Sequence, residues 1–180
     1  GLYDADPEDF VIVSDVDEII RPLAIQYVRD NPEHEVYGFK MPLFNFRYNY
    51  MMINQDFHNI WSMGCHRRLL DQVQPEDFKH SRIHFNFHPG VCNIDHAGWH
   101  FTWLGDEEFV QNKLGSFSHN EADRPDVRAQ IDLEASIESG MGYNRMNTPE
   151  RYVPVKMDWY MPQTLTNNLE KYQDWIIPNA

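Results

Sequence analysis

The chain has 180 residues, of which 42% are hydrophobic and 14% aromatic, so it holds enough apolar material for a folded core and is not expected to be disordered. Its formal net charge of −13 argues against nucleic-acid binding, because such binding needs a basic surface that replaces phosphate counterions. The length predicts one domain, residues 1–180. The chain contains no run of about 20 apolar residues, so the sequence predicts no membrane span.

Apolar runs, alternating patterns and proline positions predict a mixture of strands and helices. The predicted strands are residues 10–14, 36–53 with a break near Pro42, 60–63, and 83–87 within loops that cover 71–95. The predicted helices are residues 23–30 after Pro22, 107–117 with Asp106 as N-cap, 125–139 ending at Gly140, and 165–175. This mixture indicates an α/β or α+β fold.

Two aspartates follow the first predicted strand. Asp15 and Asp17 are two residues apart, so on an extended chain their side chains point to the same side. Paired carboxylates beyond a strand are typical of a site for a hard cation such as Mg²⁺ or Mn²⁺. The cation would bind a diphosphate and stabilise the charge on a leaving group. The alternative is a solvated turn, which most isolated Asp-x-Asp triplets form.

A glycine lies within an aromatic segment further along the chain. Gly98 is flanked by bulky residues, which indicates close approach of the backbone to a ligand. Trp99 and Trp103 are candidates for stacking on a sugar, or for the core. His96 and His100 are four residues apart, but a zinc site needs further ligands, and the His-Glu-x-x-His motif of a zinc protease is absent.

Acidic residues begin the next predicted helix. A carboxylate of Asp106, Glu107 or Glu108 at the mouth of a site can accept the proton of an acceptor hydroxyl. At least two of the three are expected to be ordinary helix-start acids, which the helix dipole favours. His119 follows the helix, and its imidazole can complete a metal site or bond to the last helical carbonyls.

Four segments that lie along nearly the whole chain can be considered together. They are residues 11–19, 96–103, 113–121 and 161–165, the last followed by Asn168 and Tyr172. Together they resemble glycosyltransferase family 17, the family of the β-1,4-mannosyl-glycoprotein 4-β-N-acetylglucosaminyltransferase, which adds bisecting N-acetylglucosamine. The Gly-Trp-His-Phe-Thr-Trp segment carries most of the specificity of this resemblance, since Asp-x-Asp alone is common.

The resemblance implies an inverting transferase that uses Mn²⁺ or Mg²⁺ to move a sugar, N-acetylglucosamine, from a UDP-sugar donor to a glycan acceptor. A single in-line displacement then needs one base and one stabilised leaving group. By position in the motifs, the resemblance implies that the metal ligands are Asp17, Asp15 and His119. It implies that the donor or acceptor is bound by Gly98, Trp99, His100 and Trp103. The first choice for the base is Glu108, and the second is Glu107.

The resemblance also implies an α/β fold of the GT-A type, with a mixed sheet flanked by helices. Few residues precede Asp15, so much of the nucleotide-binding half is expected to be lacking, and residues 1–180 correspond to the C-terminal portion of a catalytic domain. The absence of a membrane segment suits a cytoplasmic protein of bacterial or viral origin. An upstream anchor would instead place the chain in the Golgi lumen. The oligomeric state stays open.

Two other functions fit the same residues. An inactive transferase-like or carbohydrate-binding module would use the aromatic residues as stacking platforms and the acids for a structural cation. A glycoside hydrolase would use Asp17 and Glu108 as its two carboxylates. Binding of UDP that depends on Mn²⁺ separates the transferase from both alternatives.

Overall fold

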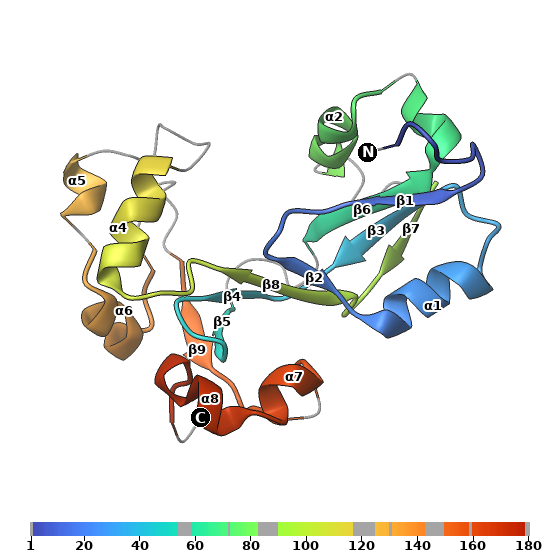
Figure 1. Cartoon of the computed structure of the whole chain (residues 1–180). Helices are drawn as coiled ribbons and strands as arrows, with labels where there is room; N and C mark the ends of the chain where they lie inside the picture. The colour runs from blue at the N-terminus through green and yellow to red at the C-terminus, as the bar shows by residue number, and fades with distance from the viewer. Residues whose placement is uncertain are drawn as a thin grey trace. The chain divides into compact units, whose positions relative to one another are not determined.

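The computed structural model describes residues 2–53, 59–71, 73–82, 90–116, 125–129, 131–142, 150–158 and 160–178. Strands and helices are mixed along the chain, and the sheets contain the mixed strand pairings expected of the α/β class (Figure 1). The chain forms two compact units, one of Gly1–Pro42 with Asp56–His100, the other of Leu43–Gln55 with Phe101–Ala180. Among the described helices, none has the length and apolar character that crossing a membrane requires.

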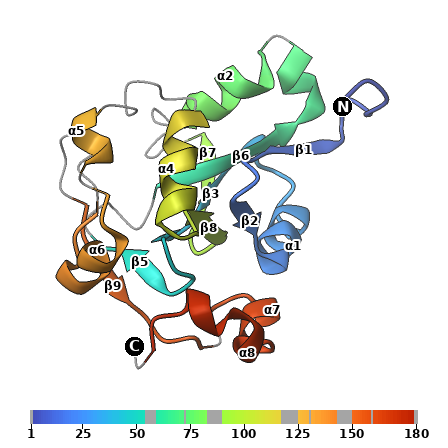
Figure 2. The same ribbon diagram turned by 60° about the vertical axis from the view of Figure 1, so that its left-hand side comes forward.

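The first unit is built on a four-stranded sheet of order β1-β6-β3-β7. Its strands are β1 (Phe10–Val13), β6 (Ile60–His66), β3 (Val36–Lys40) and β7 (Val91–Ile94). β6 is antiparallel to β1 and β3, whereas β7 is parallel to β3. Other described elements of this unit include β2 (Glu18–Ile20), helices α1 (Pro22–Asp30) and α2 (Pro75–His80), and the 3₁₀ helix Arg67–Asp71. α1 and α2 lie on opposite sides of the sheet in both views (Figures 1 and 2).

The alternation of side chains along the strands explains these two layers, because successive residues point to opposite faces. Tyr37 and Phe39 are buried in one cluster with Ala24 and Val28 of α1. On the other face, Phe78 of α2 is buried in a cluster with strand residues Ile60, Met63 and Cys65. α1 begins at Pro22, a residue whose fixed φ suits the first helical position.

The second unit contains the antiparallel strands β4, β5 and β9 in that order. Its strands are β4 (Leu43–Asn45), β5 (Tyr50–Met52) and β9 (Tyr152–Pro154). Its helices are α4 (Glu107–Ser116), α5 (Pro125–Arg128), α6 (Leu133–Ser139), α7 (Gln163–Thr166), α8 (Leu169–Tyr172) and the 3₁₀ helix Gln173–Trp175. One apolar cluster joins Tyr50 and Tyr152 of the strands with Val110 and Leu114 of α4.

The first strand, the helix after Pro22 and the helix capped by Asp106 are confirmed near their predicted bounds. The single helix predicted over 165–175 is wrong, because α7, α8 and the 3₁₀ helix Gln173–Trp175 divide that segment. The helix predicted over 125–139 is divided into α5 and α6, because Asp132 caps a new helix by accepting a hydrogen bond from the Ala135 backbone at 2.9 Å. The prediction of loops over most of 71–95 is wrong, since α2 and β7 lie there, and the strand predicted at 83–87 lies outside the described residues.

Tyr50 gives the second unit a stability that depends on pH. Burial raises the pKa of Tyr50 to about 12, and its hydroxyl donates to the Ser136 carbonyl at 2.9 Å. Unfolded tyrosine ionises near pH 10, so the contribution of Tyr50 to stability is full below pH 10 and is lost as the pH rises towards 12. We expect Tyr50→Phe to make the alkaline decline in the free energy of unfolding less steep. Urea titrations between pH 8 and 12 on both chains measure it, and an equal decline in the variant would contradict it.

Candidate functional site

Residues 15–18 form a turn directly after β1. The Glu18 backbone amide donates to the Asp15 carbonyl at 3.1 Å, and the Asp15 amide donates to the Glu18 carboxylate at 2.9 Å. The prediction that Asp15 and Asp17 extend from one side of an extended chain is therefore wrong, because a turn does not keep the strand alternation. The two carboxylates contact different partners, Lys79 and His100 respectively.

A buried lysine neutralises part of this acidic turn. Nζ of Lys79, on α2, lies 2.5 Å from Asp15 Oδ2 and 3.0 Å from Glu18 Oε1. The Glu18 side chain is fully buried, and its Oε2 also accepts hydrogen bonds from Ser62 Oγ at 2.9 Å and Ser14 Oγ at 3.2 Å. Every oxygen of Glu18 thus has a partner, as a buried carboxylate requires.

The pairing of β2 with β8 (Gly98–Thr102) brings the acidic turn to the Gly-Trp-His segment. In this antiparallel register Glu18 lies opposite His100, and Ile20 opposite Gly98. His100 Nε2 lies 3.6 Å from Asp17 Oδ1. Three predicted site residues, Asp15, Asp17 and His100, therefore belong to one cluster within the first unit.

His100 is buried at the centre of this cluster, and its ring packs edge-on against Trp61 with 4.3 Å between centroids. Within the described part of the chain, its Nδ1 has no hydrogen-bond partner. Burial lowers the pKa of His100, against the opposing effect of the carboxylates of Asp17, Glu18 and Asp15, so the neutral imidazole is favoured.

Asp15 keeps its charge in this setting. Burial raises the pKa of its carboxyl group, but the hydrogen bond and charge of Lys79 lower it, and the net direction is downward. The carboxylate form is therefore stabilised well below neutral pH.

A glycine is needed at position 98 because the neighbouring strand β2 leaves no space for a side chain. The prediction that Gly98 allows close approach to a ligand is therefore corrected. A Cβ atom at this position would clash with the carbonyl oxygen of Ile19 and crowd the backbone of Ile20. The absence of a side chain thus allows β2 and β8 to pair at this point.

We expect Gly98→Ala to destabilise the first unit by about 1–3 kcal/mol, because the neighbouring backbone cannot move aside as a flexible side chain would. Chemical denaturation followed by circular dichroism measures the change. Gly115→Ala, at an exposed position in α4, is the control and is expected to be stabilising, since alanine favours a helix. Equal stability of Gly98→Ala and the parent chain would contradict the role of Gly98.

The two tryptophans predicted to stack on a sugar are buried. Trp99 is 6% exposed, and the guanidinium carbon of Arg21 lies 4.7 Å from its ring centroid. Trp103 is 3% exposed in the core cluster of the second unit, with Nζ of Lys113 at 5.0 Å. Burial and these cation–π contacts favour the alternative role of both residues in the core.

The candidate bases belong to the second unit. Glu107 and Glu108 are exposed in the first turn of α4, where the helix dipole favours acids. Asp106 caps the helix, with its Oδ1 accepting from the Phe109 backbone amide at 2.8 Å. The choice of Glu108 before Glu107 stays a prediction. His119, predicted as a metal ligand, lies outside the described residues.

The acidic turn offers carboxylate oxygens, which are the ligands that hard divalent cations prefer. Across the part of the chain that the structure describes, no three His, Cys, Asp or Glu side chains form a group that could hold a metal ion. Mg²⁺ and similar ions commonly use only one or two carboxylates and take their other ligands from water and substrate phosphates. At such a site Asp17 and Asp15 would be the candidate protein ligands, although Asp15 Oδ2 is already 2.5 Å from Lys79 Nζ.

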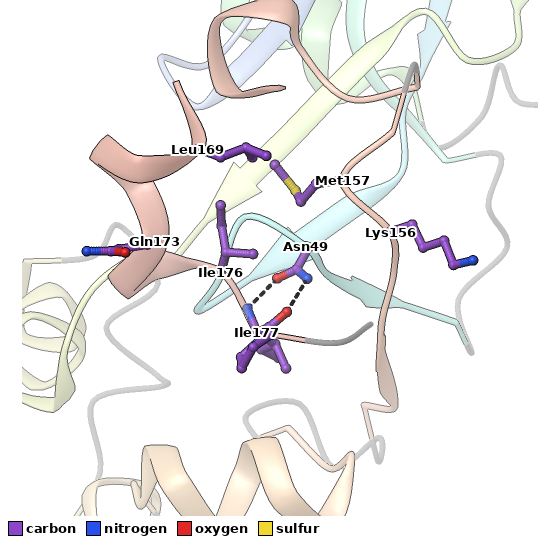
Figure 3. Close-up of a pocket in the computed structure, with 8 residues that line it drawn as sticks. Asn49, Lys156, Met157, Leu169, Gln173, Ile176 and Ile177 are labelled. Atoms are coloured by element: carbon purple, nitrogen blue, oxygen red, sulfur yellow. Dashed lines mark hydrogen bonds between the residues drawn. The ribbon is translucent and has the colours of Figure 1, made fainter. Parts of the chain in front are cut away.

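A separate pocket of about 320 Å³ lies in the second unit (Figure 3). Its polar amide, Asn49, is already used: it donates to the carbonyl of Ile177 at 3.0 Å and accepts from the Ile177 amide at 2.8 Å. Most of the other lining residues are apolar, namely Met157, Leu169, Ile176 and Pro178. Because Asn49 holds the C-terminal segment in place, we assign the pocket no chemistry.

Comparison of the chain with protein-family models, curated proteins and solved structures found no significant match.

Lys79 and Ser62 also contact the acidic turn, but the sequence did not single them out. Signals for the helix that carries Lys79 were present: Pro75 can begin a helix, and Glu76 and Asp77 suit a first turn. Ser62 had no such signal, because its contact with Glu18 depends on the pairing of β1 with β6.

Proposed function

We propose that this chain is the catalytic part of a metal-dependent inverting glycosyltransferase. It would transfer a sugar, N-acetylglucosamine by the family resemblance, from a UDP-sugar to a glycan acceptor. One observation carries most of the support: the β2–β8 register joins the Asp-Val-Asp turn to the Gly-Trp-His segment, with Asp17 Oδ1 3.6 Å from His100 Nε2. These are two of the stretches on which the resemblance depends.

In this proposal the residues of the turn have distinct tasks. Asp17 is the first-choice ligand of Mn²⁺ or Mg²⁺, which, when bound with the donor, supplies positive charge that stabilises the diphosphate leaving group. Asp15, which is paired with Lys79, is the second-choice ligand. The buried, neutral His100 orients the Asp17 carboxylate without adding a competing positive charge. The choice of Glu108 as base, with Glu107 as second choice, comes from the family resemblance alone.

Isothermal titration calorimetry with UDP-N-acetylglucosamine, with and without Mn²⁺, tests this function. The transferase is expected to bind the nucleotide much more tightly when Mn²⁺ is present. Equal binding with and without the cation would reject the metal-dependent transferase. Binding of a glycan without any nucleotide binding would instead support the carbohydrate-binding module.

A further inference from the structure

Lys79 is the one described lysine that is buried against the acidic turn, and nothing in the family motifs assigned it a role. Its residue exposure is 5%, and its Nζ bridges Asp15 Oδ2 at 2.5 Å and Glu18 Oε1 at 3.0 Å. We propose that Lys79 is a positioning residue that acts as an internal counter-cation and keeps the turn from binding a divalent cation before the nucleotide arrives. This inference depends on the proposed function.

The contacts of Glu18 make this ammonium a fixed part of the site. Glu18 holds Lys79 through Oε1, while its Oε2 is bound by Ser62, Ser14 and the Asp15 backbone. Moving Lys79 away would leave a buried carboxylate without its cation, which is strongly unfavourable. Lys79 therefore stays in place when a ligand binds.

A fixed positive charge at Asp15 has two effects on a divalent cation. It occupies an oxygen of Asp15, and it repels a second cation a few ångströms away. A diphosphate adds negative charge and oxygen ligands that offset this repulsion. The cation is thus expected to bind well only together with the nucleotide, so that metal binding and donor binding are coupled.

Replacement of the ammonium by an apolar side chain of similar length tests the inference. Mn²⁺ binding is measured by electron paramagnetic resonance of the free ion, with Mn²⁺ alone and with Mn²⁺ plus UDP. In Lys79→Met, binding of Mn²⁺ alone is expected to strengthen about tenfold, because the repulsion is removed and Asp15 is released. Lys156→Met, at an exposed position of the second unit, is the matched control and is expected to match the parent chain.

A second variant keeps the inference testable if Lys79→Met does not fold. Glu18→Gln combined with Lys79→Met removes both buried charges together, which is generally tolerated better than removal of one. This chain is also expected to bind Mn²⁺ alone more tightly than the parent chain does. Folding of both chains is checked by circular dichroism.

The outcomes separate this inference from the proposed function. Unchanged affinity for Mn²⁺ alone in folded variants would overturn the role of Lys79, even if UDP strengthens Mn²⁺ binding in the parent chain. Failure of both variants to fold would assign Lys79 to folding alone and would also overturn it. Absence of any effect of UDP on Mn²⁺ binding in the parent chain would instead reject the proposed function.

Discussion

Asp17→Asn is expected to abolish the effect of Mn²⁺ on UDP binding. The amide keeps the shape of the side chain but loses the charge and the strong oxygen ligand that a hard cation prefers. We expect the nucleotide to bind at least about 100-fold more weakly in the presence of Mn²⁺, a change of about 2.7 kcal/mol. Calorimetry with UDP and Mn²⁺ on the variant and the parent chain measures this loss.

The matched controls distinguish Asp17 from other acids of the first unit. Asp4→Asn, at an exposed position near the chain start, is expected to leave Mn²⁺-dependent binding unchanged. Asp15→Asn is expected to have a smaller effect than Asp17→Asn, because its carboxylate is already paired with Lys79. An Asp17→Asn chain that retains the full Mn²⁺ dependence would remove the physical basis of the metal site.

The local elements were predictable because their signals are local. The run Phe-Val-Ile-Val predicts β1, and Pro22 predicts the start of α1, without knowledge of any partner. Asp132 could also have been recognised, since an N-cap residue inside a predicted helix indicates a new helix start. Segments whose conformation depends on nearby residues can thus be predicted from the sequence.

The candidate site was predicted only in part, because its remaining contacts join distant segments. The acidic turn and His100 were singled out by residue type, yet their proximity arises from the β2–β8 register. Sequence spacing suggested that Gly98 makes room for a ligand, whereas the structure shows that it makes room for Ile19. Such pairings depend on tertiary packing, which no local pattern in this chain encodes.

Glu18→Ala is expected to destabilise the first unit by about 3–5 kcal/mol, the typical cost of breaking a buried ion pair by removing one partner. The change removes the partner that Lys79 Nζ contacts at 3.0 Å and leaves the hydroxyls of Ser14 and Ser62 without their carboxylate acceptor. Asp15 remains as a partner of Lys79, but its side chain is 64% exposed, so it screens the ammonium less well. Urea denaturation followed by circular dichroism measures the loss.

Two comparisons show whether the loss comes from the buried charge. Glu33→Ala removes a carboxylate that is 64% exposed in the same unit, and its effect is expected to stay below about 1 kcal/mol, as for most surface pairs. Glu18→Gln combined with Lys79→Met should recover much of the stability lost in Glu18→Ala, since no buried charge is left without a partner. If Glu18→Ala lowered the free energy of unfolding no more than Glu33→Ala does, the contacts of Glu18 would not stabilise the acidic turn.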